Sequence, residues 1–502
     1  MKAFLMHKDQ DFDFERELPP NKQALTQDLA LHILFETMAR DDEFLLEMAK
    51  KAVLSSLSDP DSILYRQNIL KDCLKNSSIV RDIYNLSVES IENRQKQWWA
   101  TRYPSTIMFS AVEALKMFVA QLKRLKTIAD EHADKFDSEG FARFFSMLLA
   151  ELDDKYFAII EEYLKELKLR KGMLMSAELG KSNKSVNFVL HKTRDLKKQS
   201  FLERVFRKQS PVYSFRLSPR DEIGAKALSD LRDKGLNLVA NVVAQSSDHI
   251  LSFFQMLRTE LAFYVGCLNL HEQLMQKGEP VCFPVPAGPG RRESSFHGLY
   301  DVCLALSVTQ RVVGNQMKAD RKDLVIITGA NRGGKSTFLR SIGQSQLMMQ
   351  AGMFVPAESF CAAACAGVFT HYRREEDNTM KSGKLDEELR RMSDIADNIT
   401  QNSMMLFNES FAATYEKDGS EIARQITTAL LEKGVRVFFV THLYEFAHGL
   451  FDNGMKNAIF LRAERKPDGT RTFRLLPGEP LRTSYGEDLY HRILTDISPI
   501  PT

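Results

Sequence analysis

The sequence predicts an α/β domain, built on a mostly parallel sheet flanked by helices, that is preceded by an all-α domain of core and lever helices. Before about residue 279 the apolar residues follow helical spacing, whereas after it short apolar runs typical of buried parallel strands alternate with helical stretches. The densest cluster of proline and glycine, Glu279 to Gly290, marks the change. We therefore predict two domains, residues 1–278 and 279–502.

Helical periodicity is clear in two stretches of the first domain. Apolar residues recur at intervals of three and four at Val112, Leu115, Val119, Leu122 and Leu125, and again at Tyr156, Ile160, Leu164 and Leu167. Residues 221–277 contain no proline, and from Leu236 their apolar positions keep helical spacing. One helix of roughly 40 residues, about 60 Å long at about 1.5 Å per residue, is expected there. A helix of that length serves as a lever or strut.

The overall charge gives no indication of a particular partner. A formal net charge of +2 is too small to indicate a nucleic acid by itself, so any such partner has to be inferred from local patches. The first residues, Met1 to Asp11, include charged side chains that a signal peptide lacks, and no run approaches about 18 apolar residues. We therefore expect a cytoplasmic protein that has no membrane partner.

The most informative motif is Gly329-Ala330-Asn331-Arg332-Gly333-Gly334-Lys335-Ser336-Thr337, which fits the phosphate-binding pattern G-x-x-x-x-G-K-[ST]. It follows the apolar run 324–328, and a helix is expected from Ser336 to about Gln350, with its positive end directed at the anion. The motif predicts a P-loop ATPase domain that binds ATP with Mg²⁺. The residues expected at the nucleotide are Gly329, Asn331, Gly333, Gly334, Lys335, Ser336 and Thr337.

Two of these residues have individual roles in the prediction. Lys335, expected on a solvent-facing part of the loop, reaches the β- and γ-phosphates, where its charge also serves catalysis. The Ser336 hydroxyl is expected to ligate Mg²⁺.

Polar residues also follow two later apolar runs. Asn408 and Glu409 end the run 404–409, where a P-loop enzyme usually has the pair Asp-Glu to hold Mg²⁺ and polarise the attacking water. Because an amide keeps an oxygen but loses the charge, Asn408 should hold the metal more weakly, while Glu409 remains available as a base. His442 ends the run 435–442, and we expect it to touch the γ-phosphate rather than to be a core histidine.

These residues resemble a known family, the MutS proteins. The likeness lies in the run Gly329 to Glu358 with its ending Phe354-Val355-Pro356-Ala357-Glu358, and in Phe369-Thr370, Asn408-Glu409 followed by Asp418-Gly419, Thr441-His442, and Thr483-Ser484-Tyr485-Gly486. It is strong from Phe283 onward and looser over the helical region, where Asp61 to Gln67 is similar to the opening of the family's helical core. The resemblance implies an ATP-hydrolysing clamp that acts on DNA structures.

The resemblance also implies a homodimer, in which each ATPase domain lends a serine at a helix N-terminus to the partner's γ-phosphate. Ser382 is the candidate for this serine, although the residues after it, Gly383 to Glu388, differ from those of relatives. The alternative is that Ser382 only caps a helix.

The sequence departs from the family in the regions that contact DNA. Core-like sequence begins near Arg40, so we expect no mismatch-reading domain and no mismatch specificity. Residues 192–220 carry nine lysines and arginines against two acidic residues, with Phe201, Phe206 and Tyr213 between them, which suits a nucleic-acid backbone or, alternatively, a solvated basic turn. A second function class stays open, namely a nucleotide-dependent switch with weak or no hydrolysis that acts on a ribosomal or protein partner.

Overall fold

The structure is a computed structural model, and it describes residues 1–96, 103–170, 172–181, 184–191, 213–374 and 383–482. The chain forms two compact units. Unit 1 contains residues 1–3, 81–136 and 142–258, and unit 2 contains residues 4–80, 137–141 and 259–502. The first helices of the chain thus share a unit with the sheets. The domain division at residue 278 stays a prediction.

Unit 1 is mainly helical. Its elements are α5 (Ser77–Lys96), α6 (Pro104–His132), the 3₁₀ turn η1 (Ala133–Lys135), α7 (Glu139–Glu151), α8 (Asp154–Glu166), β1 (Leu174–Leu179), β2 (Ser185–His191) and α10 (Glu222–Gln276), of which α5, α7 and α10 continue into unit 2. The predicted stripe on α6 is buried at all its positions, from Val112 to Leu125, whereas Leu164 alone is buried in the stripe on α8. The long helix α10 has 55 residues, more than the sequence indicated.

A β-hairpin in unit 1 corrects the prediction that residues 1–278 are all helical. Strands β1 and β2 pair antiparallel, and all of their side chains are exposed or half-buried. Met175 fills the space beside Gly235 of α10, where a built Cβ would lie 1.9 Å from its sulfur atom. Because none of its strand side chains is buried, the hairpin lacks the strong alternation of apolar and polar residues that indicates a strand.

One helical stretch among the described residues, 104–135, has the length and apolar composition that a membrane span requires. Half of its apolar window is buried inside the protein. Met108, Phe118 and Leu122 are among its buried residues, and the Phe118 ring stacks on that of Phe254 at 5.9 Å.

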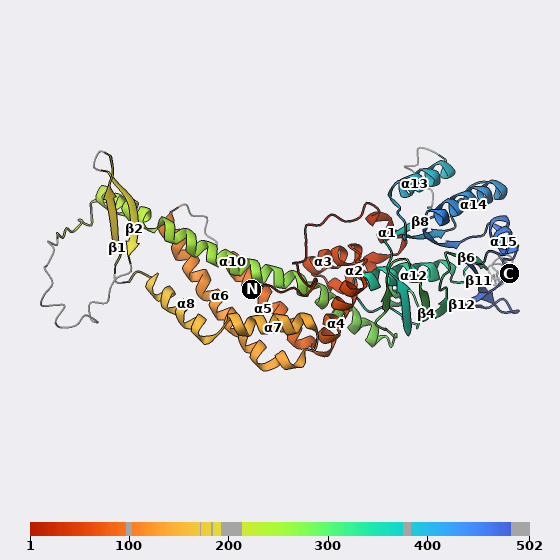
Figure 1. Cartoon of the computed structure of the whole chain (residues 1–502), viewed down its shortest axis with the longest axis horizontal. Helices are drawn as coiled ribbons and strands as arrows, with labels where there is room; N and C mark the ends of the chain where they lie inside the picture. Colours follow the sequence, from red (N-terminus) through yellow and green to blue (C-terminus); the bar gives the residue numbers. More distant parts are fainter. Residues whose placement is uncertain (97–102, 171, 182–183, 192–212, 375–382, 483–502) are drawn as a thin grey trace, which may run out of the picture. The chain divides into compact units, whose positions relative to one another are not determined.

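Unit 2 contains two sheets and the helices around them (Figure 1). Its helices are α1 (Lys22–Asp28), α2 (Leu31–Ala39), α3 (Glu43–Leu54), α4 (Pro60–Lys75), α11 (Val302–Ser307), α12 (Lys335–Gln350), α13 (Lys384–Asn398), α14 (Glu416–Glu432) and α15 (Tyr444–Asp452). Its strands are β3 (Val285–Ala287), β4 (Ser294–Leu299), β5 (Asn315–Lys318), β6 (Leu324–Gly329), β7 (Ser359–Ala363), β8 (Val368–Tyr372), β9 (Met404–Asn408), β10 (Arg436–Val440), β11 (Ala458–Arg465) and β12 (Arg471–Pro477).

The larger sheet of unit 2 confirms the predicted α/β fold. Its strand order is β12-β11-β6-β10-β9-β8, in which β12 pairs antiparallel at one edge and all other neighbours pair parallel. The smaller sheet has the order β3-β7-β4-β5. Strands β6, β9 and β10 are neighbours in the larger sheet, so their carboxyl ends meet at one edge. In parallel sheets such an edge is where ligands bind.

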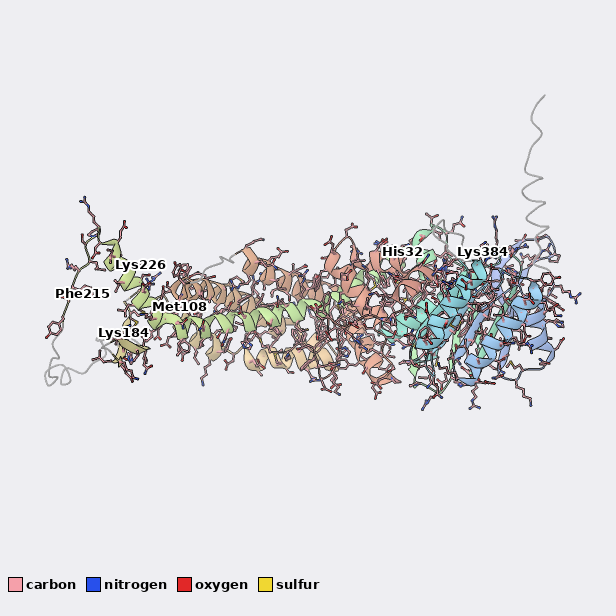
Figure 2. The ribbon with its side chains drawn as sticks, turned by 90° about the horizontal axis from the view of Figure 1, so that it is seen from above. His32, Met108, Lys184, Phe215, Lys226 and Lys384 are labelled. Carbon is pink, nitrogen blue, oxygen red and sulfur yellow. The ribbon has the colours of Figure 1, made fainter. Side chains whose placement is uncertain are left out.

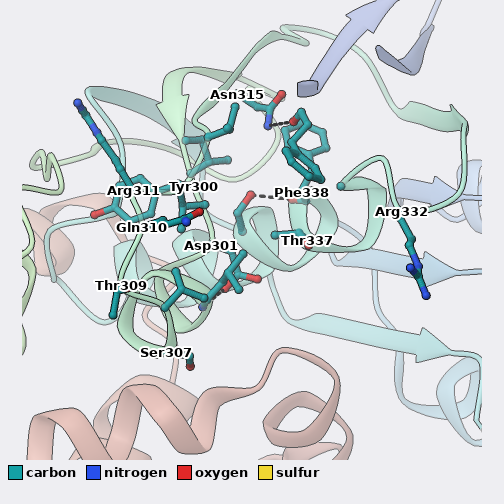
Figure 3. A pocket seen from close by; sticks show the side chains of 18 residues that line it. Tyr300, Asp301, Ser307, Thr309, Gln310, Arg311, Asn315, Arg332, Thr337 and Phe338 are labelled. Atoms are coloured by element: carbon teal, nitrogen blue, oxygen red, sulfur yellow. Dashed lines mark hydrogen bonds between the residues drawn. The ribbon is translucent and has the colours of Figure 1, made fainter. Parts of the chain in front are cut away.

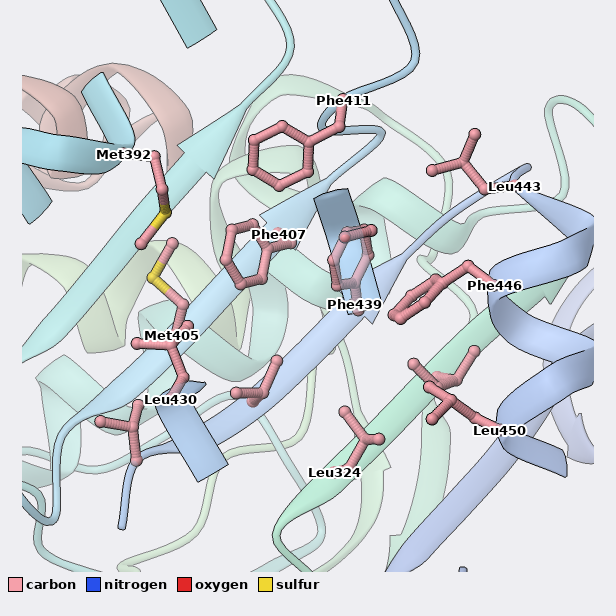
Figure 4. Close-up of a cluster of buried hydrophobic side chains, with 14 of the residues drawn as sticks. Leu324, Met392, Met405, Phe407, Phe411, Leu430, Phe439, Leu443, Phe446 and Leu450 are labelled. Carbon is pink, nitrogen blue, oxygen red and sulfur yellow. The ribbon is translucent and has the colours of Figure 1, made fainter. Parts of the chain in front are cut away.

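Helices cover both faces of the larger sheet. On one face, Phe407 of β9 and Phe439 of β10 stack at 4.6 Å, and α13, α14 and α15 add Met392, Leu430 and Phe446 to the same cluster (Figure 4). On the other face lies α12, where a Cβ built on Gly343 would be only 2.7 Å from Leu406 of β9. Helix α12 begins within one residue of the predicted start and ends at the predicted residue. These contacts fix the end of β6 relative to the ends of β9 and β10.

Candidate nucleotide-binding site

The loop between β6 and α12 has the backbone that its glycines permit. Gly329 has φ +110°, and Gly334, the N-cap residue of α12, has φ +87°. A Cβ built on Gly329 would lie 2.8 Å from the backbone nitrogen of Ala463, and one on Gly333 would lie 2.7 Å from the Ala463 Cβ. Strand β11 therefore packs directly against the loop. Side chains at these two positions would push the loop and the strand apart.

Lys335 is buried, which corrects the expectation that it faces solvent. Its side chain is 5 % exposed, and its ammonium donates hydrogen bonds to the carbonyl oxygens of Gly329 at 3.1 Å and of Ala330 at 3.0 Å. Burial lowers the pKa of Lys335 to about 8, with the negative charge of Glu409 opposing the shift and the positive charge of Arg471 adding to it. In this structure the ammonium thus rests inside the loop that would surround a phosphate.

Two further pairs of side chains stand around the loop. The Ser336 hydroxyl donates to the Asn408 amide oxygen at 2.8 Å. His442 Nε2 lies 3.2 Å from Glu409 Oε1. The hydrogen bond from His442 holds the pKa of Glu409 below its usual range despite partial burial, and the charges of His442, Lys335 and Arg373 act in the same direction. Glu409 is therefore a carboxylate at neutral pH.

Lys335, Ser336, Asn408, Glu409 and His442 thus meet at the carboxyl ends of β6, β9 and β10. Glu409 has φ +54°, an unusual value for a residue with a side chain, and its N–H donates to the Val440 carbonyl of β10 at 2.9 Å. Asn331 is exposed on the loop, and Thr337 is half-buried in the first turn of α12. His442 contacts Glu409 here, and its contact with a γ-phosphate stays a prediction.

The side chains at this edge offer oxygen ligands that suit Mg²⁺, but they lack the negative charge that usually accompanies such ligands. Hydroxyl, amide and phosphate oxygens are the hard ligands that Mg²⁺ prefers, and Ser336 and Asn408 provide the first two. The carboxylate that usually stands in the place of Asn408 is missing, so the protein supplies less negative charge to the ion. Within the described ranges no group of three or more histidine, cysteine, aspartate or glutamate side chains is arranged to hold a metal.

A cavity of about 730 Å³ opens beside the loop and was not predicted from the sequence (Figure 3). Arg332, Gly334 and Thr337 are among the residues that line it, together with Tyr300, Phe473 and most residues of the segment 307–315. Its size falls within the range of about 300 to 1,000 Å³ that is usual for small-molecule sites. The cavity begins where the first turn of α12 begins.

Phe473, an aromatic residue that lines this cavity, lies on β12, the strand that pairs with β11. It has φ +61°, its side chain is 48 % exposed, and its carbonyl accepts a hydrogen bond from Asn315 Nδ2 at 3.1 Å. The segment 307–315 is in turn held by residues that follow α10. Lys277 Nζ donates to the Val308 carbonyl at 2.6 Å, and the Val312 N–H donates to Glu279 at 3.0 Å.

Three predicted features fall wholly or partly outside the described residues, one of them the run Thr483 to Gly486. Ser382 lies outside them, and helix α13 after it begins at Lys384 with Gly383 as its N-cap residue. Of the basic segment 192–220, the structure describes 213–220, where Tyr213 and Phe215 are 90 % and 79 % exposed. Figure 2 shows Phe215 extending away from the ribbon.

The lowered pKa of Lys335 predicts how nucleotide affinity depends on pH. Without nucleotide the ammonium loses its proton near pH 8, and phosphate charges raise the pKa again, so binding above pH 8 must take up a proton. We expect the affinity for ADP to fall about tenfold between pH 7 and pH 9. Calorimetric titration in buffers of different ionisation enthalpy measures both the affinity and the proton uptake. The variant Lys335→Arg, which stays charged, should give a flat profile, and a flat profile in the unmodified protein would contradict the assignment.

Comparison with protein-family models gives two matches, which include parts of both units. The model described as MutS2 N-terminal domain matches residues 58–277, and the model described as MutS domain V matches residues 325–488. The second match includes the loop after β6, the ends of β9 and β10, and the β11–β12 hairpin.

Each curated relative described here matches only a part of this chain, about a third to a half of its length. A DNA mismatch repair protein MutS of Thermotoga neapolitana is 32 % identical over 186 residues, which are 36 % of this chain and 23 % of the relative. Its counterpart from Thermus aquaticus is 34 % identical over 33 % of this chain and 20 % of its own. A MutS protein of Streptococcus pneumoniae is 25 % identical over 51 % of this chain and 31 % of its own. The matched part thus spans less than a third of the length of each of these relatives.

Proposed function

The chain belongs to the MutS family, and from this premise we propose that it binds and hydrolyses ATP as a homodimeric clamp acting on DNA structures without mismatch specificity. The observation that carries the proposal is the meeting of Lys335, the Ser336–Asn408 pair and the His442–Glu409 pair at one sheet edge. Phosphoryl transfer to water needs a cation on the phosphates, a metal held beside them and a carboxylate to orient the water. This edge offers groups suited to each of these tasks.

Each predicted residue has a role in the proposed site. The backbone N–H groups of the loop, from Gly329 and Asn331 through Gly333 and Gly334 to Thr337, bind the phosphates, and Lys335 leaves the two carbonyl oxygens to contact them. Ser336 ligates Mg²⁺, and Asn408 contacts its water shell. Mg²⁺ supplies charge neutralisation when bound.

Glu409 and His442 act on the reacting end of the nucleotide. Glu409, already ionised, accepts a hydrogen bond from the attacking water and so orients it. His442 holds this carboxylate in place by the hydrogen bond from its Nε2, and we assign to it the contact with the γ-phosphate that the sequence predicts.

The cavity lined by Phe473 and the segment 307–315 suits the base of the nucleotide. It opens directly at Gly334 and Thr337, where the phosphates would lie, and it offers an aromatic ring for stacking beside apolar residues such as Val312. We place the adenine there.

The partners in the proposal are a second copy of the chain and DNA. Ser382 would contact the γ-phosphate bound by the partner subunit, and the basic segment 192–220, with the exposed rings of Tyr213 and Phe215, would contact the nucleic-acid backbone. We place the protein in the cytoplasm, without a membrane partner. The alternative, a weakly hydrolysing switch on a ribosomal or protein partner, is favoured by the amide of Asn408.

The test of the proposed function is ATP turnover by the full chain at stated salt, alone and with duplex DNA, branched DNA, single-stranded DNA or ribosomes. We expect turnover that rises severalfold with a DNA structure and is insensitive to a mismatch in the duplex. Stimulation by ribosomes alone would favour the switch. Binding of no nucleotide at all would overturn both functions.

A further inference from the structure

The β11–β12 hairpin covers the loop after β6 along its length. In the parallel register of β11 and β6, Ala463 is the partner of Gly329, and Ala463 also fills the space beside Gly333. On the neighbouring strand, Phe473 lies about 3.5 Å from where a Cβ on Gly334 would stand. The hairpin therefore brings side chains of the larger sheet to this loop, in addition to Asn408 of β9.

Arg471, the first residue of β12, reaches the loop from this hairpin. Its Nε donates to the carbonyl oxygen of Asn331 at 3.2 Å, and its Nη1 donates to that of Gly469 at 2.7 Å. The register of the two strands shifts between Ala463 and Arg465, and Arg465 is the partner of Arg471. A cross-strand hydrogen bond from Thr472 to Glu464 at 2.7 Å stabilises the hairpin beside the arginine. The guanidinium is thus held at the third residue of the phosphate-binding motif.

The charges around the loop are complementary to a polyphosphate. The guanidinium of Arg471 and the ammonium of Lys335 bind carbonyl oxygens of three consecutive residues of the loop, Arg471 that of Asn331 and Lys335 those of Gly329 and Ala330. An anion bound at this loop is attracted by both positive charges. Asn408 is an amide where a P-loop enzyme usually has a carboxylate, so the part of the site that would hold the metal has one negative charge less. The protein groups around the phosphates are therefore more positive in sum.

We propose that Arg471 binds the terminal phosphate of a nucleoside triphosphate held in the same subunit. This inference rests on the proposed function, because it assigns a new contact at the same site. The backbone N–H groups at the start of α12 would bind the inner phosphates. The guanidinium of Arg471, which lies at Asn331, would then bind the terminal phosphate. Guanidinium is suited to this position because its donors form paired hydrogen bonds to phosphate oxygens and its charge is permanent.

The proposed contact has a chemical consequence. Negative charge on the outer oxygens changes as the terminal phosphoryl group is transferred to water, and an arginine placed there stabilises that charge. In this chain the arginine is supplied by the same subunit, so part of the charge stabilisation is independent of the partner. The contact also distinguishes a triphosphate from a diphosphate.

Binding measurements on the full chain separate this role from a structural one. We expect Arg471→Ala to weaken the affinity for a non-hydrolysable ATP analogue by about 10- to 100-fold, while the affinity for ADP changes by less than about threefold. Turnover of ATP should fall in the same variant. Lys466→Ala removes an exposed cation from the turn of the same hairpin and is the matched control, expected to change neither affinity. Arg471→Lys should recover part of the selectivity, since it keeps the charge but loses the paired donors.

Two results would overturn the inference itself. Equal loss of analogue and ADP affinity would make Arg471 a positioning residue that acts on the loop through Asn331, and unchanged affinities would make it an ordinary surface arginine. Failure of the unmodified protein to bind either nucleotide would instead remove the proposed function itself. Thermal unfolding of each variant shows whether a loss of affinity reflects a loss of folded protein.

Discussion

Replacing Lys335 by alanine is expected to weaken ATP binding by about 100-fold or more, because the ammonium is the main point charge for the β- and γ-phosphates and charge-assisted hydrogen bonds are the strongest polar contacts in such a site. The fold should persist, because the variant removes a buried charge whose hydrogen bonds go to two carbonyl oxygens of the same loop. Equilibrium binding of a fluorescent ATP analogue, together with the thermal unfolding midpoint, measures both effects.

A second lysine provides the control for this variant. Lys322 precedes β6 at the opposite end of the strand, where its ammonium donates to the carbonyl oxygen of Lys456. Lys322→Ala should therefore leave nucleotide affinity unchanged. Unchanged affinity in Lys335→Ala as well would remove the basis for an ATP site at this loop.

Much of the candidate site was predictable because its residues lie in one contiguous loop or directly at the ends of apolar runs that form strands. The loop from Gly329 to Ser336 is contiguous and joins a strand to a helix, so its conformation follows from local sequence. Asn408 and His442 are distant in sequence, but each follows an apolar run, and parallel strands bring their carboxyl ends to one edge. The pairing of Ser336 with Asn408 is the result of that geometry.

Other features depend on tertiary contacts that leave no local pattern. Arg471 and Phe473 belong to a hairpin whose position over the loop is decided by the pairing of β11 with β6, more than 130 residues earlier in the chain. The burial of Lys335 was missed because the motif specifies a lysine but not the packing around it. The β1–β2 hairpin was missed because its largely exposed side chains show neither the helical nor the strand period clearly.

Replacing Glu409 by glutamine is expected to lower ATP turnover by about 100- to 10,000-fold while leaving ATP affinity nearly unchanged. The amide keeps the size of the side chain and a hydrogen bond to His442, but it no longer offers the attacking water the negative charge that Glu409 has in this structure. Glu479→Gln is the control, since Glu479 forms a similar pair with His448, also at 3.2 Å, away from the loop. Single-turnover measurements separate the chemical step from binding.

The substitution Asn408→Asp, at the neighbouring residue, tests the role of this edge in holding Mg²⁺, and it is expected to increase activity rather than to decrease it. An aspartate keeps the oxygen that accepts the Ser336 hydroxyl and adds a full negative charge beside Mg²⁺, where reduced dielectric makes charge more effective than in bulk water. We therefore expect faster hydrolysis or saturation at lower Mg²⁺ in this variant. If Asn408→Asp is no faster at any Mg²⁺ concentration and Glu409→Gln is silent, the site binds nucleotide without being built to hydrolyse it. The protein is then the nucleotide-dependent switch, and the pairs around Lys335 serve to sense the nucleotide rather than to cleave it.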